Sequence, residues 1–248
     1  MPINVVQSQS DGVRILAPHN STHLQQVSIA FGLNVTAGNT IIVAVGCPSS
    51  TNSITATFPS VTDSLGNTYT QATWANSASQ IAGIGIFWFK IPSGGADTVT
   101  FSVFITNFNP IFDLNYDLGI AVVEMSGMGA SPALHAANTA QQGPGTLPLA
   151  ITLTDQYGTS VTSNFGSFSQ TSCAVADIAA VGADVFVAAL CGSTVSPTTP
   201  SVSPPGYMTY NLQENAVFGG SNYPIALWVR NTPILPGVIP LPQFFIVT

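Results

Sequence analysis

The feature that most constrains the fold of this chain is an alternation of apolar and polar residues with a period of two. In the segment DTVTFSVFIT, residues 97–106, every odd-numbered position from Val99 to Ile105 is apolar, and most even-numbered positions carry Ser or Thr. The segment SITATF, residues 53–58, repeats the pattern and predicts that Ile54, Ala56 and Phe58 point inward. Helical periodicity is nearly absent, so the pattern favours half-buried β-strands.

A second group of segments is apolar on both faces. Such strands are typical of the centre of a sheet that other layers, loops or neighbouring subunits cover on both sides. These segments are Thr40–Val45, Ile84–Ile91, Gly119–Met125 and Asp184–Leu190. Further strands are expected at Val27–Phe31, Thr68–Trp74, Pro148–Leu153, Tyr207–Leu212, Ile225–Arg230 and Phe244–Thr248.

Turn residues separate the expected strands. Asp63–Asn67 (DSLGN) places a glycine where the chain must reverse, and Pro92–Gly95 does the same before the alternating segment. Only Ser131–Gln142, which is rich in alanine and begins with a serine cap, could hold a short helix. The pattern therefore predicts an all-β fold, an antiparallel two-sheet β-sandwich or jelly roll.

The end of the sequence differs from the rest. We expect residues 1–230 to form a single β-sandwich domain and residues 231–248 (NTPILPGVIPLPQFFIVT) to form an extended Pro-rich C-terminal arm and strand. Proline lacks the amide donor of a sheet ladder, so the proline stretch does not fit a central strand. The arm could join subunits by adding its strand to another sheet, or that strand could lie on its own sheet. The residues assigned to assembly are Pro233, Pro236, Pro240, Pro242, Phe244, Phe245 and Ile246.

Charged residues make up only 5% of the 248 residues, and ten carboxylates against three cations give a net charge of −7. An acidic surface without a basic patch argues against nucleic-acid binding. Apolar runs are strand-sized, which argues against a membrane-spanning helix. The first residues, MPINVVQ, lack the basic and apolar regions of a secretion signal.

The order of several turn and strand segments resembles a family of β-sandwich modules found in phage virion proteins and secreted bacterial surface proteins. The resemblance spans roughly residues 27 to 195 and implies a concanavalin-like or jelly-roll fold with a structural or adhesive role, without a catalytic signature to transfer. The residues that carry it are Val35–Thr40 leading into IIVAVG, Val61–Thr70, the FWFK strand, Gly94–Thr100 and Val123–Gly127.

One segment is a candidate calcium site. Asp113, Asn115 and Asp117 have the first, third and fifth positions of a calcium loop, and Glu124 has the twelfth. Leu118 stands where such a loop requires glycine, and Glu124 ends an apolar strand. A polar loop between strands is the alternative, so calcium is the one cofactor that the sequence leaves open.

No other motif predicts chemistry. His19 and His23 have a zinc-like spacing, but Pro18 favours a loop, and His135 has no obvious partner. No nucleophile elbow or phosphate-binding loop occurs, and the aspartates fall mostly at expected strand edges and turns, so no catalytic residue is expected. Cys47 and Cys191 are expected to be buried free thiols, with a Cys173–Cys191 disulfide as the alternative.

Aromatic residues leave one further alternative. Trp74, Trp88 and Trp228 could form a platform that stacks on sugar rings, although core and interface packing is the simpler interpretation. We therefore expect a non-enzymatic structural virion subunit, a capsid decoration or accessory tail or fibre protein, assembled in the host cytoplasm. It would bind itself, as a homo-oligomer, and other structural proteins of the particle, but neither nucleic acid nor membrane. The alternatives are an extracellular filament or adhesion subunit joined by strand exchange and a carbohydrate-binding module.

Overall fold

The computed structural model describes residues 3–47, 54–76, 83–142, 147–154, 160–168, 171–180, 183–193, 201–203, 212–218 and 222–229. Every regular element in these ranges is a strand, and all strand pairs are antiparallel, which confirms the all-β class. The strands are β1 (Asn4–Ala17), β2 (Ser21–Ala30), β3 (Thr40–Cys47), β4 (Ile54–Asp63), β5 (Thr70–Asn76), β6 (Gly83–Lys90), β7 (Thr98–Asn107), β8 (Leu114–Ser126), β9 (Ala133–Gln142), β10 (Leu147–Thr154), β11 (Ser160–Phe168), β12 (Thr171–Ala180), β13 (Ala183–Ser193), β14 (Ser201–Ser203), β15 (Leu212–Phe218) and β16 (Asn222–Val229).

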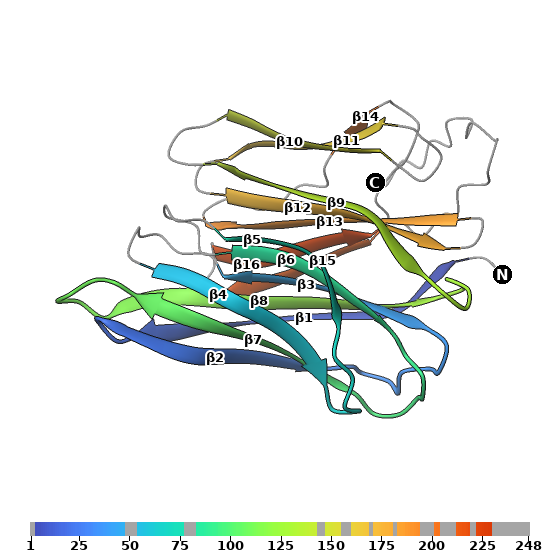
Figure 1. The fold of residues 1–248 in the computed structure, drawn as a ribbon, viewed down its shortest axis with the longest axis horizontal. Coiled ribbons are helices and arrows are strands. Elements are labelled where there is room, and N and C mark those ends of the chain that lie inside the picture. The colour runs from blue at the N-terminus through green and yellow to red at the C-terminus, as the bar shows by residue number, and fades with distance from the viewer. Residues whose placement is uncertain are drawn as a thin grey trace.

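The strands form four sheets that stack as layers, seen from bottom to top in Figure 1. Sheet I has the order β2-β7-β4 and sheet II the order β1-β8-β3-β6-β5. Sheet III has the order β15-β16-β13-β12-β9, and sheet IV the order β10-β11-β14. Face-to-face packing of antiparallel sheets is the sandwich principle that the alternation predicts, and this chain applies it across more than one pair of sheets.

The first core lies between sheets I and II. The odd-numbered residues of β7 from Val99 to Ile105 are buried there, as the alternation predicts, together with Ile54 and Ala56 of β4. Phe58 corrects the same prediction, because its side chain is 80% exposed. A β-bulge between Thr57 and Ser60 shifts the register, which reverses the face to which Phe58 points.

The second core lies between sheets II and III and explains the segments that are apolar on both faces. In β3, Ile41, Val43 and Val45 pack into the first core, whereas Ile42 and Ala44 pack into the second. Strands β6 and β8 also contribute to both cores. Layers of the same chain therefore cover these strands, so their two apolar faces are not evidence for a neighbouring subunit.

Sheet IV covers the other face of sheet III. Ile151 and Leu153 of β10 and Phe165 of β11 are buried, although both strands belong to the outermost sheet. The third strand of sheet IV is the short β14, which pairs with β11 through three residues. The expected helix at Ser131–Gln142 is wrong, because residues 133–142 form β9, paired with β12 along its length.

The turn after β4 confirms the local prediction. Gly66 has a φ of +86°, and Asp63 Oδ1 accepts hydrogen bonds from the amides of Leu65 (3.0 Å) and Asn67 (2.9 Å). The domain boundary at residue 230 stays a prediction, because residues 230–248 lie outside the described residues. No helix of the described residues is long and apolar enough to cross a membrane.

Candidate functional site

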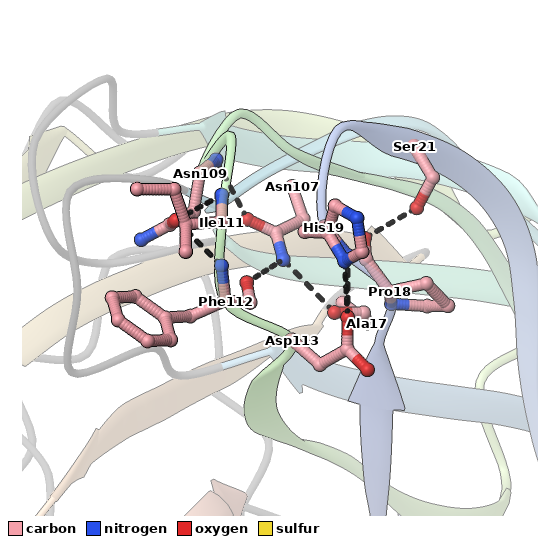
Figure 2. A network of polar contacts seen from close by, with 9 residues as sticks. All are labelled: Ala17, Pro18, His19, Ser21, Asn107, Asn109, Ile111, Phe112 and Asp113. Carbon is pink, nitrogen blue, oxygen red and sulfur yellow. Dashed lines mark hydrogen bonds and ion pairs between the residues drawn. The ribbon is translucent and has the colours of Figure 1, made fainter.

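Two loops meet at one end of sheet I, and an asparagine side chain joins them (Figure 2). Asn107, the buried last residue of β7, donates from Nδ2 to the carbonyl oxygens of Ala17 (2.9 Å) and Phe112 (3.1 Å). Its Oδ1 accepts a hydrogen bond from the amide of Asn109 (2.9 Å). One buried amide group thus ties the end of β1 to the loop between β7 and β8.

Asn109 organises the loop itself. Its Oδ1 accepts hydrogen bonds from the amides of Ile111 and Phe112, both at 2.9 Å, and its carbonyl oxygen accepts one from the amide of Asn20 (2.9 Å). Side-chain bonds of this kind substitute for backbone turns and hold a loop in one conformation. Asn20 has a φ of +48°, a left-handed conformation that asparagine tolerates.

His19 and Asp113 close the same end of the sandwich. The amide and the Nδ1 of His19 both lie 2.8 Å from Asp113 Oδ1. These contacts with His19 lower the pKa of the Asp113 carboxyl. The hydroxyl of Ser21 donates to the carbonyl oxygen of Pro18. His19 therefore makes a structural contact with a carboxylate, and the expected exposed loop position of this histidine is confirmed.

The loop held by these bonds presents apolar side chains to solvent. Phe108, Ile111 and Phe112, here called the apolar tip, are 61%, 69% and 63% exposed. Exposed apolar side chains that cluster on a fixed backbone indicate a contact surface more often than isolated ones do.

The outer face of sheet I carries a second exposed apolar group. Leu24 of β2 lies opposite Phe104 of β7, and Phe58 of β4 contacts Phe104 with ring centroids 6.4 Å apart. All three side chains are exposed. We call Leu24, Phe104 and Phe58 the apolar strip, because it crosses the three strands of sheet I.

The four calcium candidates do not converge. Asp113 lies in the loop with His19, and Asn115 is an exposed residue of β8. Asp117 accepts two hydrogen bonds from Arg14, Nε to Oδ1 at 2.8 Å and Nη2 to Oδ2 at 3.1 Å. Glu124 lies seven residues further along the same strand, about 23 Å away. Among the described residues, no group of three His, Cys, Asp or Glu side chains is placed to hold a metal ion.

Glu124 has a structural role instead. Its side chain is fully buried, and Oε1 accepts hydrogen bonds from the amide of Thr36 (2.8 Å) and from Asn39 Nδ2 (2.6 Å). Its Oε2 accepts one from Gln7 Nε2 (2.6 Å). Because a buried carboxylate is stable only when donors surround it, this cluster ties β1 and the loop before β3 to β8.

The expected tryptophan platform is not formed by Trp74 and Trp88. Trp74 packs on the first core beside Phe101, with ring centroids 6.2 Å apart, whereas Trp88 packs on the second core. The two rings therefore lie on opposite faces of sheet II. Added Cβ atoms at Gly83 and Gly85 would lie 2.4 Å and 2.8 Å from the Trp74 indole, so these glycines make room for it. The side chain of Trp228 lies outside the described residues.

The thiols of Cys47 and Cys191 are free and buried, as expected. Because Cys191 is free, the alternative Cys173–Cys191 disulfide is wrong; the side chain of Cys173 itself lies outside the described residues. Burial raises the pKa of both described thiols well above its usual range, which keeps them protonated and unreactive.

His135 has a partner that the sequence did not reveal. It lies in β9, and its Nδ1 is 3.2 Å from Oδ2 of Asp177, a buried residue in the middle of β12. Asp177 is therefore an exception to the expectation that the aspartates lie mostly at strand edges and turns. Asp63 does lie at the turn where it was expected. The pKa of the nearby Asp97 carboxyl is raised, mainly by its burial and also by the negative charge of Asp63.

No family model and no curated protein matches this chain. The residues assigned to the assembly arm, from Pro233 to Ile246, lie outside the described residues. Sequence reasoning missed the apolar tip and the apolar strip. A signal for the strip was present, since Phe104 is the one large apolar residue on the polar face of residues 97–106.

Proposed function

We propose that this protein is a non-enzymatic structural subunit of a virion, a capsid decoration or an accessory tail or fibre protein, that associates with copies of itself and with other structural proteins of the particle. The observation that carries the proposal is the apolar tip, Phe108, Ile111 and Phe112, exposed on a loop whose backbone Asn107 and Asn109 hold in place. A fixed loop loses little conformational entropy on binding, which favours association through its side chains.

Charge supports contacts of this kind. Arg14 is bonded to Asp117, and Lys90 donates to the carbonyl oxygens of Gly38 and Gly129. Two of the three cations of the chain therefore serve its own structure. A subunit with this composition gains affinity mainly from apolar burial and main-chain hydrogen bonds, because it has few cations for ion pairs with a partner.

Three of the described carboxylates support a non-enzymatic role. Glu124, Asp117 and Asp63 each accept several hydrogen bonds from neighbouring backbone or side-chain groups. General acids and bases must instead reach a substrate from a cleft, with a proton free to move. The arrangement of these groups favours stabilisation of loops and strand edges.

A secreted filament or surface-adhesion subunit is the second candidate, because the same apolar surfaces would serve it. The two differ in their genes: neighbouring capsid or tail genes support the virion, and an export signal encoded upstream supports the filament. Fold resemblance alone does not choose between them. A carbohydrate-binding module is less favoured, since Trp74 and Trp88 lie in separate cores.

Sedimentation velocity of the full chain over a wide concentration range tests the proposal. We expect concentration-dependent association that the double variant Ile111→Ser/Phe112→Ser weakens at least about tenfold, a change of about 1.4 kcal/mol. Leu33→Ser is the matched control, because Leu33 is equally exposed, at 69%, in another loop. A chain that stays monomeric at every concentration, with and without the substitutions, would contradict self-association.

A further inference from the structure

One sheet edge differs from all the others in the described part of the chain. The pairing of β2 with β7 runs through ten residue pairs, Ser21–Asn107 to Ala30–Thr98, without a register shift. The edge strands β1, β4, β5, β9, β10 and β15 all have a shift in their pairing, and β14 has three residues. Bulges and short strands are the usual means by which proteins prevent a sheet edge from pairing further.

The backbone of β2 presents regular donors and acceptors at this edge. The amide of Phe31 donates to the carbonyl oxygen of Asp97, on the β7 side. Along an antiparallel strand, successive residues direct their backbone N–H and C=O groups to opposite sides. The odd-numbered residues of β2 therefore form the backbone hydrogen bonds with β7. The even-numbered residues therefore direct their N–H and C=O groups away from the sheet; these are Thr22, Leu24, Gln26, Ser28 and Ala30.

The side chains of β2 offer no other protection. The sequence STHLQQVSIA contains no proline, lysine, arginine or carboxylate. By contrast, β4 at the opposite edge contains Pro59 and Asp63, and β1 contains Asp11 and Arg14. The apolar strip begins at Leu24, so an added strand would place its side chains beside an apolar surface that continues to Phe104 and Phe58.

We propose that the open edge of β2 accepts residues Gln243–Thr248 of a second copy of this chain as an added strand. This inference rests on the proposed function, since it names the edge and the segment by which the subunits join. Main-chain hydrogen bonds to the even-numbered residues of β2 supply affinity, and alternate side chains of the segment QFFIVT supply specificity next to Leu24.

Charge and size favour this occupant over the body of a second molecule. Residues 231–248 contain no charged side chain, whereas each whole chain has a net charge of −7. An uncharged segment can approach the uncharged edge of β2 without the repulsion that two acidic bodies experience. A single strand also needs less room than a whole second molecule beside β1, which lies close to β2.

The length of the segment that follows β16 allows it to reach a second copy. The described chain ends at Val229 in sheet III, and sheet II lies between that sheet and sheet I (Figure 1). Two sheet spacings amount to about 20 Å. Residues 231–242 contain four prolines, and a Pro-rich sequence of twelve residues can span up to about 37 Å. That reach is long enough for a neighbouring copy and also for the same copy, so the exchange rates of the monomer distinguish the two occupants.

The test compares the full chain with Gln26→Pro and Gln26→Thr. Both substitutions remove the Gln26 Nε2 bond to Ser102 Oγ (2.8 Å), but only proline removes the outward amide, which an edge strand tolerates. We expect Gln26→Thr to associate as the unmodified chain does and Gln26→Pro to associate at least tenfold more weakly. A synthetic peptide of residues 238–248 should dissociate the assembly, whereas a scrambled peptide of the same composition should not.

Hydrogen exchange on the unmodified chain completes the test. In the associated form the amides of Leu24, Gln26 and Ser28 should exchange slowly, and Ile246→Asp should restore fast exchange.

Association that Gln26→Pro leaves intact, with fast exchange at these amides, would overturn the inference and leave the proposed function standing. A monomer with slow exchange would mean that the chain's own arm occupies the edge, and a monomer with fast exchange would overturn both proposals. If Gln26→Pro does not fold, the inference is tested by peptide competition and by the association of Ile246→Asp. Association that neither of them weakens would overturn the inference.

Discussion

The ring of Phe58 meets the ring of Phe104 edge to face, with centroids 6.4 Å apart and ring planes at 89°. Phe58 has a φ of +51° and is 80% exposed, so a strained backbone holds this ring in solvent. Such a conformation costs a bulky residue of order 1–3 kcal/mol and tends to persist where it serves a function. The strain is therefore consistent with a ring that contributes to a contact surface.

Replacing Phe58 with glycine should separate stability from association. Glycine adopts a positive φ without strain, so Phe58→Gly is expected to raise the free energy of unfolding by about 1 kcal/mol while it weakens association. Denaturant unfolding and sedimentation measure the two effects. Phe104→Thr, at a position without a positive φ, serves as the control and should weaken association without raising stability. A Phe58→Gly chain that is less stable than the unmodified one would contradict the strain argument.

Glu124→Gln should destabilise the fold by about 1–3 kcal/mol, because an amide NH₂ would replace one of two carboxylate oxygens that accept hydrogen bonds. One of these oxygens accepts from Gln7, and the other accepts from Thr36 and Asn39. Gln7 cannot simply turn its amide, since its Oε1 accepts from the amide of Leu33 (3.0 Å) and its Nε2 also donates to the Leu33 carbonyl (3.1 Å). Denaturant unfolding measures the loss.

Asp113→Asn is the control for Glu124→Gln and should have a much smaller effect, because Asp113 is exposed. Added calcium should leave the Tm of both variants and of the unmodified chain unchanged, since Asp117 and Glu124 are bonded to different partners. A rise in Tm with calcium that Asp113→Asn abolishes would restore the calcium site.

Asp97 should make the fold less stable as pH rises. Burial and the nearby Asp63 raise its pKa above the ordinary value of 3.8, so folding favours the protonated carboxyl. Its stabilising effect is complete below pH 3.8 and is lost as pH rises through the raised value in the folded state. Asp97→Asn should remove this part of the pH dependence and raise the Tm at pH 7. A Tm at pH 7 below that of the unmodified chain would show that the charged form is preferred.

The buried thiols should resist modification in the folded chain. Burial raises the pKa of Cys47 and Cys191, so few thiolates form even at pH 9 and reagents have little access. In a Cys173→Ser background, alkylation monitored by mass spectrometry should label neither thiol until denaturant unfolds the protein. Rapid labelling under native conditions would show that the layer edges near these residues open.

Local chemistry predicted several elements correctly. The alternation in residues 97–106 assigned Val99 to Ile105 to the core, and the Asp63–Asn67 turn formed with the expected glycine conformation. The helix expected at Ser131–Gln142 failed because alanine content and a serine cap are weak local preferences. Pairing of β9 with β12 outweighs them, since a strand in a sheet satisfies its backbone groups through its neighbour.

The structure does not support the calcium and sugar-binding hypotheses, and here too contacts between distant segments are the reason. Spacing along a sequence does not reveal which face of a sheet a side chain occupies or which partner has already bound it. Trp74 and Trp88 are separated by sheet II, and Asp117 is bonded to Arg14 from a strand about a hundred residues away in sequence.

By itself the amino-acid sequence determined that this protein is built of β-strands, because the period of its apolar residues is a local property of each segment. Only the tertiary structure decided that the strands stack in four layers, that Glu124 is enclosed by donors and that Phe58 points outward. These outcomes depend on register shifts and on contacts between distant segments. The apolar pattern of a single segment and the spacing of its residues do not contain this information.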